Sequence, residues 1–331
     1  METSLPLQIR VSLGSAIVLG LLKGKLDVAP TTAYLMTYKE GKCTANCLFC
    51  PQARNSHAKA TLLSRVSWPV FATNDVLKMV GIASSSQKIQ RICIQALNYP
   101  GVFMHLASLI KTLKQRANLP ISVSCQPIDR GNIQSIAEAG AERIGIAIDA
   151  ATEQLFNEIK GKNGPYTWEN QLKQMREALE VFGEGKVSTH LIIGLGETEN
   201  DATNLIQRCF DMGILPALFA FTPVRGTPLE TNSQPPIESY RRIQLARYLI
   251  VNGHARFEDM RFDNTGCLTD CGVKKEALTL IVETGSPFLT SGCPDCNRPF
   301  YNEKPSGPIY NYPRNIHSEE ITVIKKQLRL R

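Results

Sequence analysis

The chain has 331 residues, of which 43% are hydrophobic and 20% charged, and its formal net charge is +7. These values are typical of a soluble globular enzyme. Because the Lys and Arg residues are spread along the sequence, we expect no nucleic-acid binding. The apolar stretch 11–22 is too short to cross a bilayer, so we also expect no membrane insertion.

Ten cysteines are a high count for this length, and most of them stand in three tight groups. We detect no secretory leader, and we interpret 11–22 as a core or barrel-plugging helix. Grouped thiols in a leaderless chain favour metal binding over disulfides and predict a protein of the reducing cytoplasm. The groups are Cys43, Cys47 and Cys50; Cys267 and Cys271; and Cys293 and Cys296.

After an N-terminal extension over 1–30, short apolar runs alternate with amphipathic stretches along the chain. The runs predict strands over 33–38, 91–96, 121–125, 143–148, 187–193, 217–221, 256–261 and 287–289. The stretches predict helices over 74–83, 101–118, 131–140, 168–183, 200–212 and 236–252. This alternation predicts an α/β fold in which residues 31–290 form a TIM-type (β/α) barrel, either with all eight units or as a partial barrel of six. Residues 291–331 form a cysteine-containing C-terminal extension, with an irregular stretch over 300–315.

The chemistry of such a barrel lies at the C-terminal ends of its strands. The cysteine group at 43–50 follows the first predicted strand, the pair at 267–271 follows the seventh, and the pair at 293–296 follows the eighth. We therefore expect all seven thiols to surround one mouth of the barrel.

The spacing of the first cysteine group favours an iron–sulfur cluster. Three thiolates at Cys43, Cys47 and Cys50 can bind three corners of a cubane and leave the fourth iron open to a bidentate ligand. A structural zinc site would need a fourth ligand, and no histidine is nearby in the sequence. We therefore predict a 4Fe-4S cluster at this loop.

These residues resemble the radical S-adenosylmethionine (SAM) superfamily, in which an aromatic residue precedes the third cysteine, as Phe49 does here. The resemblance is closest to the biotin synthase group and extends over most of the chain. Three segments carry it: Cys-Leu-Phe-Cys-Pro-Gln at 47–52, Ile-Gly-Leu-Gly-Glu-Thr at 193–198 and Val-Arg-Gly-Thr-Pro-Leu at 224–229. The resemblance implies that SAM binds the open iron and that its adenine packs near Phe49.

The predicted contacts with SAM lie at the ends of three strands. Gln95 and Ala96 end the second strand, where the family contacts the methionine moiety. Asp149 ends the fourth, where its carboxylate either accepts hydrogen bonds from the ribose, as the resemblance supports, or caps the next helix. Ile192, Gly194 and Glu197 complete the set at the fifth strand, where Gly194 and Gly196 would let the backbone approach a planar ligand.

The four cysteines between 267 and 296 predict a second metal site, but their spacing does not decide which metal it holds. Two pairs of thiolates suit a zinc ribbon or an auxiliary iron–sulfur cluster. Beside a redox cofactor in the same barrel mouth, the cluster is favoured, and we expect it to be 4Fe-4S.

A competing site lies inside the barrel. Biotin synthases hold a 2Fe-2S cluster there with cysteines on strands two, three and five and an arginine on strand seven. Cys93, Cys125 and Arg261 match three of these positions, but Ser188 stands at the other and a hydroxyl is a poor ligand for soft iron. We therefore interpret Cys93 and Cys125 as buried core residues.

The segment Ser-Gly-Cys-Pro-Asp-Cys-Asn-Arg-Pro-Phe-Tyr-Asn at 291–302 resembles the archaeal two-component lipoyl synthase. This resemblance implies sulfur insertion into an octanoyl chain on a lysine of a small carrier protein. It also implies a sister radical SAM subunit, and an electron donor such as ferredoxin would reduce the first cluster. Because cofactors carry such chemistry, we expect no catalytic side chain, and the five histidines stand in no metal or triad spacing.

Three other functions remain open. The first is biotin synthesis. The second is another radical SAM reaction, with structural zinc at the C-terminal cysteines. The third is a non-catalytic scaffold that transfers an iron–sulfur cluster to a partner.

Overall fold

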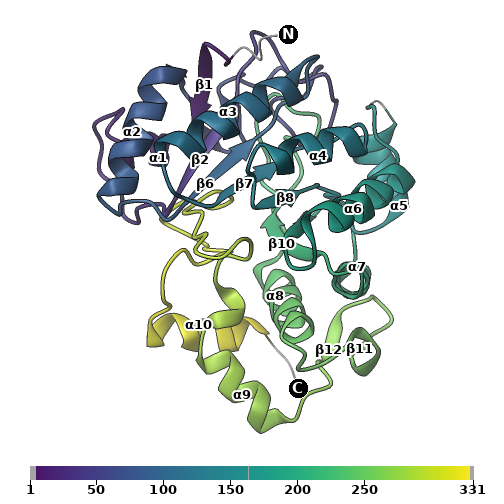
Figure 1. Ribbon diagram of the computed structural model, residues 1–331. Coiled ribbons are helices and arrows are strands. Elements are labelled where there is room, and N and C mark those ends of the chain that lie inside the picture. Colours follow the sequence, from purple (N-terminus) through teal and green to yellow (C-terminus); the bar gives the residue numbers. More distant parts are fainter. Residues whose placement is uncertain (1–4, 163, 329–331) are drawn as a thin grey trace.

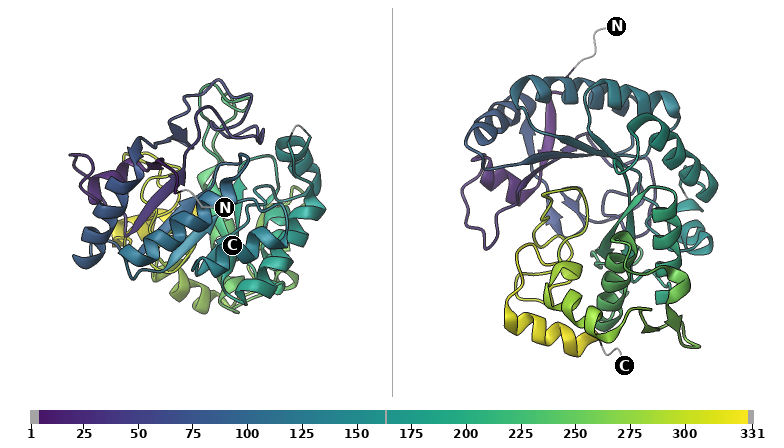
Figure 2. Two further views of the ribbon diagram at one scale, coloured as in Figure 1. Left: turned by 45° about the horizontal axis from the view of Figure 1, so that its top comes forward. Right: turned by 60° about the horizontal axis from the view of Figure 1, so that its bottom comes forward.

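A computed structural model describes residues 5–162 and 164–328, and six parallel strands form its centre. Helices cover the outer face of this curved sheet (Figures 1 and 2). The parallel strands are β2 (Thr32–Thr37), β6 (Arg91–Gln95), β7 (Ile121–Ser124), β8 (Arg143–Gly145), β9 (Val187–Ile193) and β10 (Leu215–Ala220). The outer helices are α2 (Thr73–Ser85), α3 (Val102–Arg116), α4 (Arg130–Glu138), α6 (Trp168–Phe182), α7 (Glu199–Asp211) and α8 (Ile237–Val251). The predicted α/β fold is confirmed in its six-unit form.

The N-terminal segment joins the sheet instead of preceding it. Strand β1 (Gln8–Val11) pairs antiparallel with β2 on one side and with β5 (Val70–Ala72) on the other. The expected helix over 11–22 is shorter than predicted, since α1 spans only Leu13–Val18. A small hairpin, β3 (Leu62–Leu63) with β4 (Val66–Ser67), lies in the connection between β2 and β5.

The predicted seventh and eighth strands are wrong. The segment 256–261 forms the 3₁₀ helix η2 (Phe257–Asp259), because the Asp259 carboxylate accepts a hydrogen bond from the Arg256 amide at 2.9 Å and turns the chain. The chain then forms a separate hairpin of β11 (Arg261–Phe262) and β12 (Leu268–Asp270). The segment 287–289 overlaps the 3₁₀ helix η3 (Ser286–Phe288), where Pro287 has no amide to donate to a sheet.

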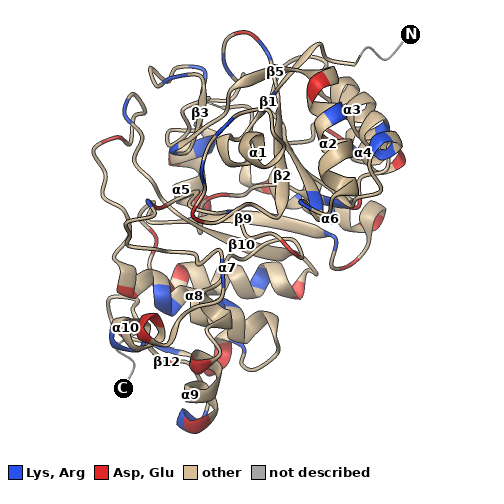
Figure 3. Ribbon diagram, turned by 90° about the vertical axis from the view of Figure 1, so that its left-hand side faces the viewer, with Lys and Arg blue, Asp and Glu red and all other residues tan. Residues whose placement is uncertain are grey.

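Four further helical elements complete the described residues. Two lie between β8 and α6, and two belong to the C-terminal part of the chain. They are α5 (Glu153–Phe156), the π-helix η1 (Asn157–Gly161), α9 (Lys275–Glu283) and α10 (Ser318–Leu328). No helix among the residues described combines the length and apolarity needed to cross a membrane. In the view of Figure 3, α8, α9 and α10 each carry both basic and acidic residues.

Residues 291–303, which we call the closing segment, lie across the open side of the partial barrel (Figure 2, right). On the β10 side, the Leu218 amide donates to the Ser291 hydroxyl at 2.8 Å. On the β2 side, the Thr31 amide donates to the Asn297 side chain at 3.0 Å. The closing segment is therefore hydrogen-bonded both to β10 and to the residue that precedes β2.

Candidate functional site

The loop after β2 brings the first three cysteines together. The Cys43 amide donates to the Gln52 carbonyl at 2.9 Å, and the Cys50 amide donates to the Cys47 carbonyl at 3.0 Å. The Asn98 amide, beyond the end of β6, donates to the Cys43 sulfur at 3.3 Å. All three cysteines line a cavity of about 140 Å³, which we call the cluster cavity.

The donor set of the cluster cavity fits an iron–sulfur cluster better than a single ion. Burial raises the pKa of the Cys50 thiol to about 12, and it raises the pKa of Cys47 further. A bound metal offsets such a penalty by stabilising the thiolates. In the described part of the chain, no three His, Cys, Asp or Glu side chains converge closely enough to hold one metal ion. A cubane cluster instead assigns each thiolate to a different iron.

The wall of the cluster cavity contains Gln95, Ala96 and Asp149, as predicted, and one cation that the sequence did not indicate. The Lys160 ammonium forms an ion pair with the Asp149 carboxylate at 2.7 Å, and both side chains are buried. The alternative role of Asp149 as a helix cap is wrong, because Thr152 caps α5. Asp149 also has a φ of 67°, a left-handed conformation that Asp tolerates better than most residues.

A second cavity of about 180 Å³, which we call the middle cavity, shares Phe49, Cys50, Gln95 and Asp149 with the cluster cavity. Ile192 also lines it. Phe49 and Ile192 pack together against the buried side chains of Ile159, Leu195 and Phe221. The predicted packing of adenine near Phe49 would add a planar base to this apolar group.

The glycine motif after β9 makes close contacts within the protein. A Cβ atom at Gly194, whose φ is 104°, would lie 2.8 Å from Cδ of Pro235. The Glu197 carboxylate accepts hydrogen bonds from the amides of Gly194 at 2.6 Å and Leu195 at 3.0 Å. Neither Gly194 nor Glu197 lines the cluster cavity or the middle cavity. The close approach at Gly194 is therefore made by protein, and Glu197 holds its own loop.

Gly226, in the segment 224–229, anchors the cysteine loop to the end of β10. Its carbonyl accepts a hydrogen bond from the His57 amide at 2.8 Å. A Cβ atom at Gly226 would lie 2.4 Å from the Ala58 backbone nitrogen. Only a residue without a side chain allows this contact.

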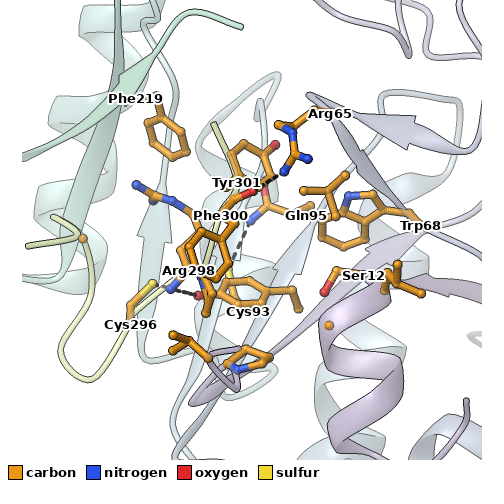
Figure 4. A pocket seen from close by; sticks show the side chains of 18 of the residues that line it. Ser12, Arg65, Trp68, Cys93, Gln95, Phe219, Cys296, Arg298, Phe300 and Tyr301 are labelled. Atoms are coloured by element: carbon orange, nitrogen blue, oxygen red, sulfur yellow. Dashed lines mark hydrogen bonds between the residues drawn. The ribbon is translucent and has the colours of Figure 1, made fainter. Parts of the chain in front are cut away.

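A third cavity, which we call the inner cavity, has a volume of about 380 Å³ and is larger than the cluster and middle cavities (Figure 4). Gln95, His190, Phe219 and Tyr301 line both it and the middle cavity, so the two are adjacent. Burial lowers the pKa of His190 to about 4, which keeps its imidazole neutral at physiological pH. The thiols and arginines that line the inner cavity are Cys93, Cys293, Cys296, Arg65 and Arg298.

The structure separates the four C-terminal cysteines. Cys267 lies in the β11–β12 hairpin and Cys271 follows it, whereas Cys293 and Cys296 lie in the closing segment. Only the latter two line the inner cavity. The expectation that all seven thiols surround one mouth is therefore wrong, because it depended on a seventh and an eighth strand that do not form.

The four positions of the competing inner site are also apart. Cys93 and Ser188 line the inner cavity, but Cys125 lines the cluster cavity. Arg261 is exposed on the hairpin. Arg65 and Arg298 line the inner cavity instead, and the Arg298 guanidinium lies 3.7 Å from the centre of the Phe219 ring. The Asn-Arg-Pro sequence around Arg298 gave no indication of this position.

A sequence model of the radical SAM superfamily matches residues 41–209, just over half of the chain. The protein therefore belongs to the radical SAM superfamily. Within it, the chain is distantly related to biotin synthases. It is 24% identical to the biotin synthase of Clostridium acetobutylicum over 71% of this chain and 70% of that protein. It is 25% identical to the biotin synthase of Desulforudis audaxviator over 78% of this chain and 76% of that protein.

Similarity to solved structures confirms the fold. Methylornithine synthase superposes with a TM-score of 0.52 at 14% identity, over 72% of this chain and 66% of that one. The FeFe-hydrogenase maturase HydG from Carboxydothermus hydrogenoformans superposes with a TM-score of 0.53 at 14% identity, over 67% of this chain and 52% of that one. The chain thus spans less than two thirds of the length of either structure. Membership of the superfamily implies a 4Fe-4S cluster and SAM, and the cluster cavity has the thiols to hold the cluster.

Proposed function

We propose that this protein is a radical SAM sulfurtransferase that inserts sulfur at an unactivated carbon. Specifically, it is a component of a lipoyl synthase that acts on an octanoyl chain attached to a lysine of a carrier protein. An auxiliary iron–sulfur cluster is the sulfur donor in this proposal. The observation that carries it is the inner cavity, which contains three thiols and adjoins the middle cavity.

The order of the cavities supports a reaction between two cofactors. The cluster, middle and inner cavities all include Gln95 in their walls, and they succeed one another through the barrel. A substrate carbon in the shared region of the middle and inner cavities would lie between the SAM site and the thiols. When bound, the first cluster and SAM supply the adenosyl radical that removes hydrogen from this carbon.

The residues of the inner cavity suit a long apolar substrate. Lys25, Asp27, Arg65 and Arg298 also line the cavity, but Phe219 and Trp68 form a buried aromatic part of its wall, where neutral His190 adds no charge. Such a lining gains free energy by excluding water from an alkyl chain, and dry walls protect a carbon radical from side reactions. The chain's own contribution is therefore to position the substrate and keep the site dry.

The proposed partners follow from the substrate. An octanoyl-lysyl residue reaches the barrel on a carrier domain, a sister radical SAM subunit adds the other sulfur, and a ferredoxin-like protein supplies electrons. The positive net charge of +7 suits a small acidic carrier. Biotin synthesis is the alternative that the curated relatives favour.

The test is anaerobic reconstitution of the full chain followed by reaction with dithionite, SAM and an octanoyl-lysyl carrier peptide. We expect 5′-deoxyadenosine together with a peptide whose mass has increased by sulfur. A parallel reaction with dethiobiotin should give no biotin. Conversion of dethiobiotin without thiolation of the peptide would replace this proposal with biotin synthesis. SAM cleavage without any thiolated product would exclude sulfur insertion.

A further inference from the structure

Cys93, Cys293 and Cys296 come from distant parts of the sequence but share the inner cavity. Cys93 lies in β6, and the other two lie in the closing segment. The Cys93 sulfur is close enough to those of Cys293 and Cys296 to interact with both electrostatically. Figure 4 shows Cys93 and Cys296 on the wall of the same cavity. Three soft donors therefore face one space inside the barrel.

The register of the sheet explains how the three thiols are held together. Cys93 is paired with Tyr34 of β2 on one side and with Ser122 of β7 on the other. The Tyr34 hydroxyl contacts the Cys296 sulfur at 3.1 Å, and the Ser122 hydroxyl contacts the Cys293 sulfur at 3.3 Å. The two strands that flank Cys93 therefore fix the other two thiols beside it.

The turn between Cys293 and Cys296 is closed by the same hydrogen bond as the turn between Cys47 and Cys50, although Asp295 alone of the central residues has a positive φ, of 63°. The Cys296 amide donates to the Cys293 carbonyl at 3.2 Å, as the Cys50 amide donates to the Cys47 carbonyl at 3.0 Å. Both pairs are separated by two residues, a spacing that suits thiolates binding neighbouring irons of one cluster. The closing segment thus presents its pair of thiols at the two ends of a hydrogen-bonded turn.

Two arginines provide positive charge next to these thiols. The Arg298 amide donates to the Tyr34 hydroxyl that contacts Cys296, and its guanidinium lies against the Phe219 ring. Arg91 is buried, and its guanidinium donates to the Ser122 hydroxyl at 3.0 Å and to the Pro294 carbonyl at 3.2 Å. A cluster bound by three thiolates carries net negative charge, and the two guanidinium groups beside these thiols would offset that charge.

We propose that Cys93, Cys293 and Cys296 bind a second iron–sulfur cluster of the 4Fe-4S type, with its fourth iron facing the inner cavity. Cys267 and Cys271 take no part, since neither lines this cavity. The assignment deepens the proposed function. The ligand set does not depend on sulfur insertion, whereas the use of this cluster as the sulfur donor rests on it.

Iron and sulfide counts on the full reconstituted chain test the assignment. We expect about eight irons per chain in the wild type and about four in Cys93→Ser and in the double variant Cys293→Ser/Cys296→Ser. The matched control, Cys267→Ser/Cys271→Ser, should keep about eight. Retained formation of 5′-deoxyadenosine from SAM in the control shows that the preparation is active, and a circular dichroism spectrum like that of the wild type in every variant shows that the barrel is folded. The proposal would be overturned by an unchanged iron content in Cys93→Ser or by a halved iron content in the control. Zinc instead of iron at the inner thiols would also overturn it.

The same preparations separate the two proposals. A wild type with about eight irons that gives no thiolated peptide would keep the cluster and reject sulfur insertion. A wild type that thiolates the peptide while Cys93→Ser keeps its full iron content would keep the function and reject this ligand set.

Discussion

The two groups of thiols inside the barrel are built in different ways. Cys43, Cys47 and Cys50 lie in one loop whose backbone hydrogen bonds are mostly its own. The inner group is assembled from a central strand and the closing segment, and 262 residues separate Tyr34 from the Cys296 sulfur that it contacts. The first site therefore depends on a local loop, whereas the second depends on closure of the barrel. Substitutions in or beside the loop at 43–50, and in the closing segment, test this difference.

The largest expected effect comes from the loop. Cys47→Ala removes one of three ligands of the first cluster, so formation of 5′-deoxyadenosine should fall to background. If the two sites are independent, the variant should keep the iron that Cys93→Ser loses. Chromatography of the nucleoside products and an iron count on the same sample check both expectations. Loss of all iron in Cys47→Ala would show that the inner site needs the first.

The next effect concerns the buried ion pair beside the loop. Lys160→Met would leave the Asp149 carboxylate buried without its cation, which costs roughly 3–5 kcal/mol in the free energy of unfolding. The double variant Asp149→Asn/Lys160→Met should lose much less, since no uncompensated charge remains. Urea denaturation measures both. Lys173→Met, which removes an exposed partner of Glu177, should cost about 0.5 kcal/mol or less. Equal losses for Lys160→Met and Lys173→Met would contradict a buried ion pair.

The smallest effect belongs to the closing segment and depends on pH. Burial raises the pKa of Glu303 to about 7 from an ordinary value of 4.5. The unfolded chain therefore loses this proton first, and stability should fall as the pH rises from about 4.5 to about 7, then level off. The expected decrease is on the order of 2–3 kcal/mol. Glu303→Gln should abolish this part of the pH dependence, as urea denaturation at several pH values would show. An identical profile in wild type and variant would contradict it.

The parts of the fold that the sequence predicts are those with strong local patterns. The six parallel strands are short runs rich in apolar residues with helices between them, so their positions and approximate ends were predictable. Strand β1 pairs antiparallel at the edge and has only four residues, too few for a clear pattern. The apolar runs at 256–261 and 287–289 resemble strands but contain a local turn at Asp259 and a proline at 287.

The same distinction applies to the site. The first cysteine group is visible in the sequence because its spacing is local. The ion pair of Lys160, the position of Arg298 and the approach of Cys93 to the closing segment depend on contacts between distant residues. Only the registers of β2, β6 and β7 show that Tyr34, Cys93 and Ser122 lie side by side.

The position of the closing segment in the sequence also decides when the inner thiols can come together during synthesis. The ribosome completes the loop at 43–50 early, and the six strands follow, but Ser122 must wait a further 171 residues for Cys293. A nascent chain can therefore fold its first cysteine loop while the barrel is still open on one side. The interior remains accessible to large donors of iron and sulfide until this late stretch folds across it. Any cluster at the inner thiols has to be delivered or built after translation has passed residue 296.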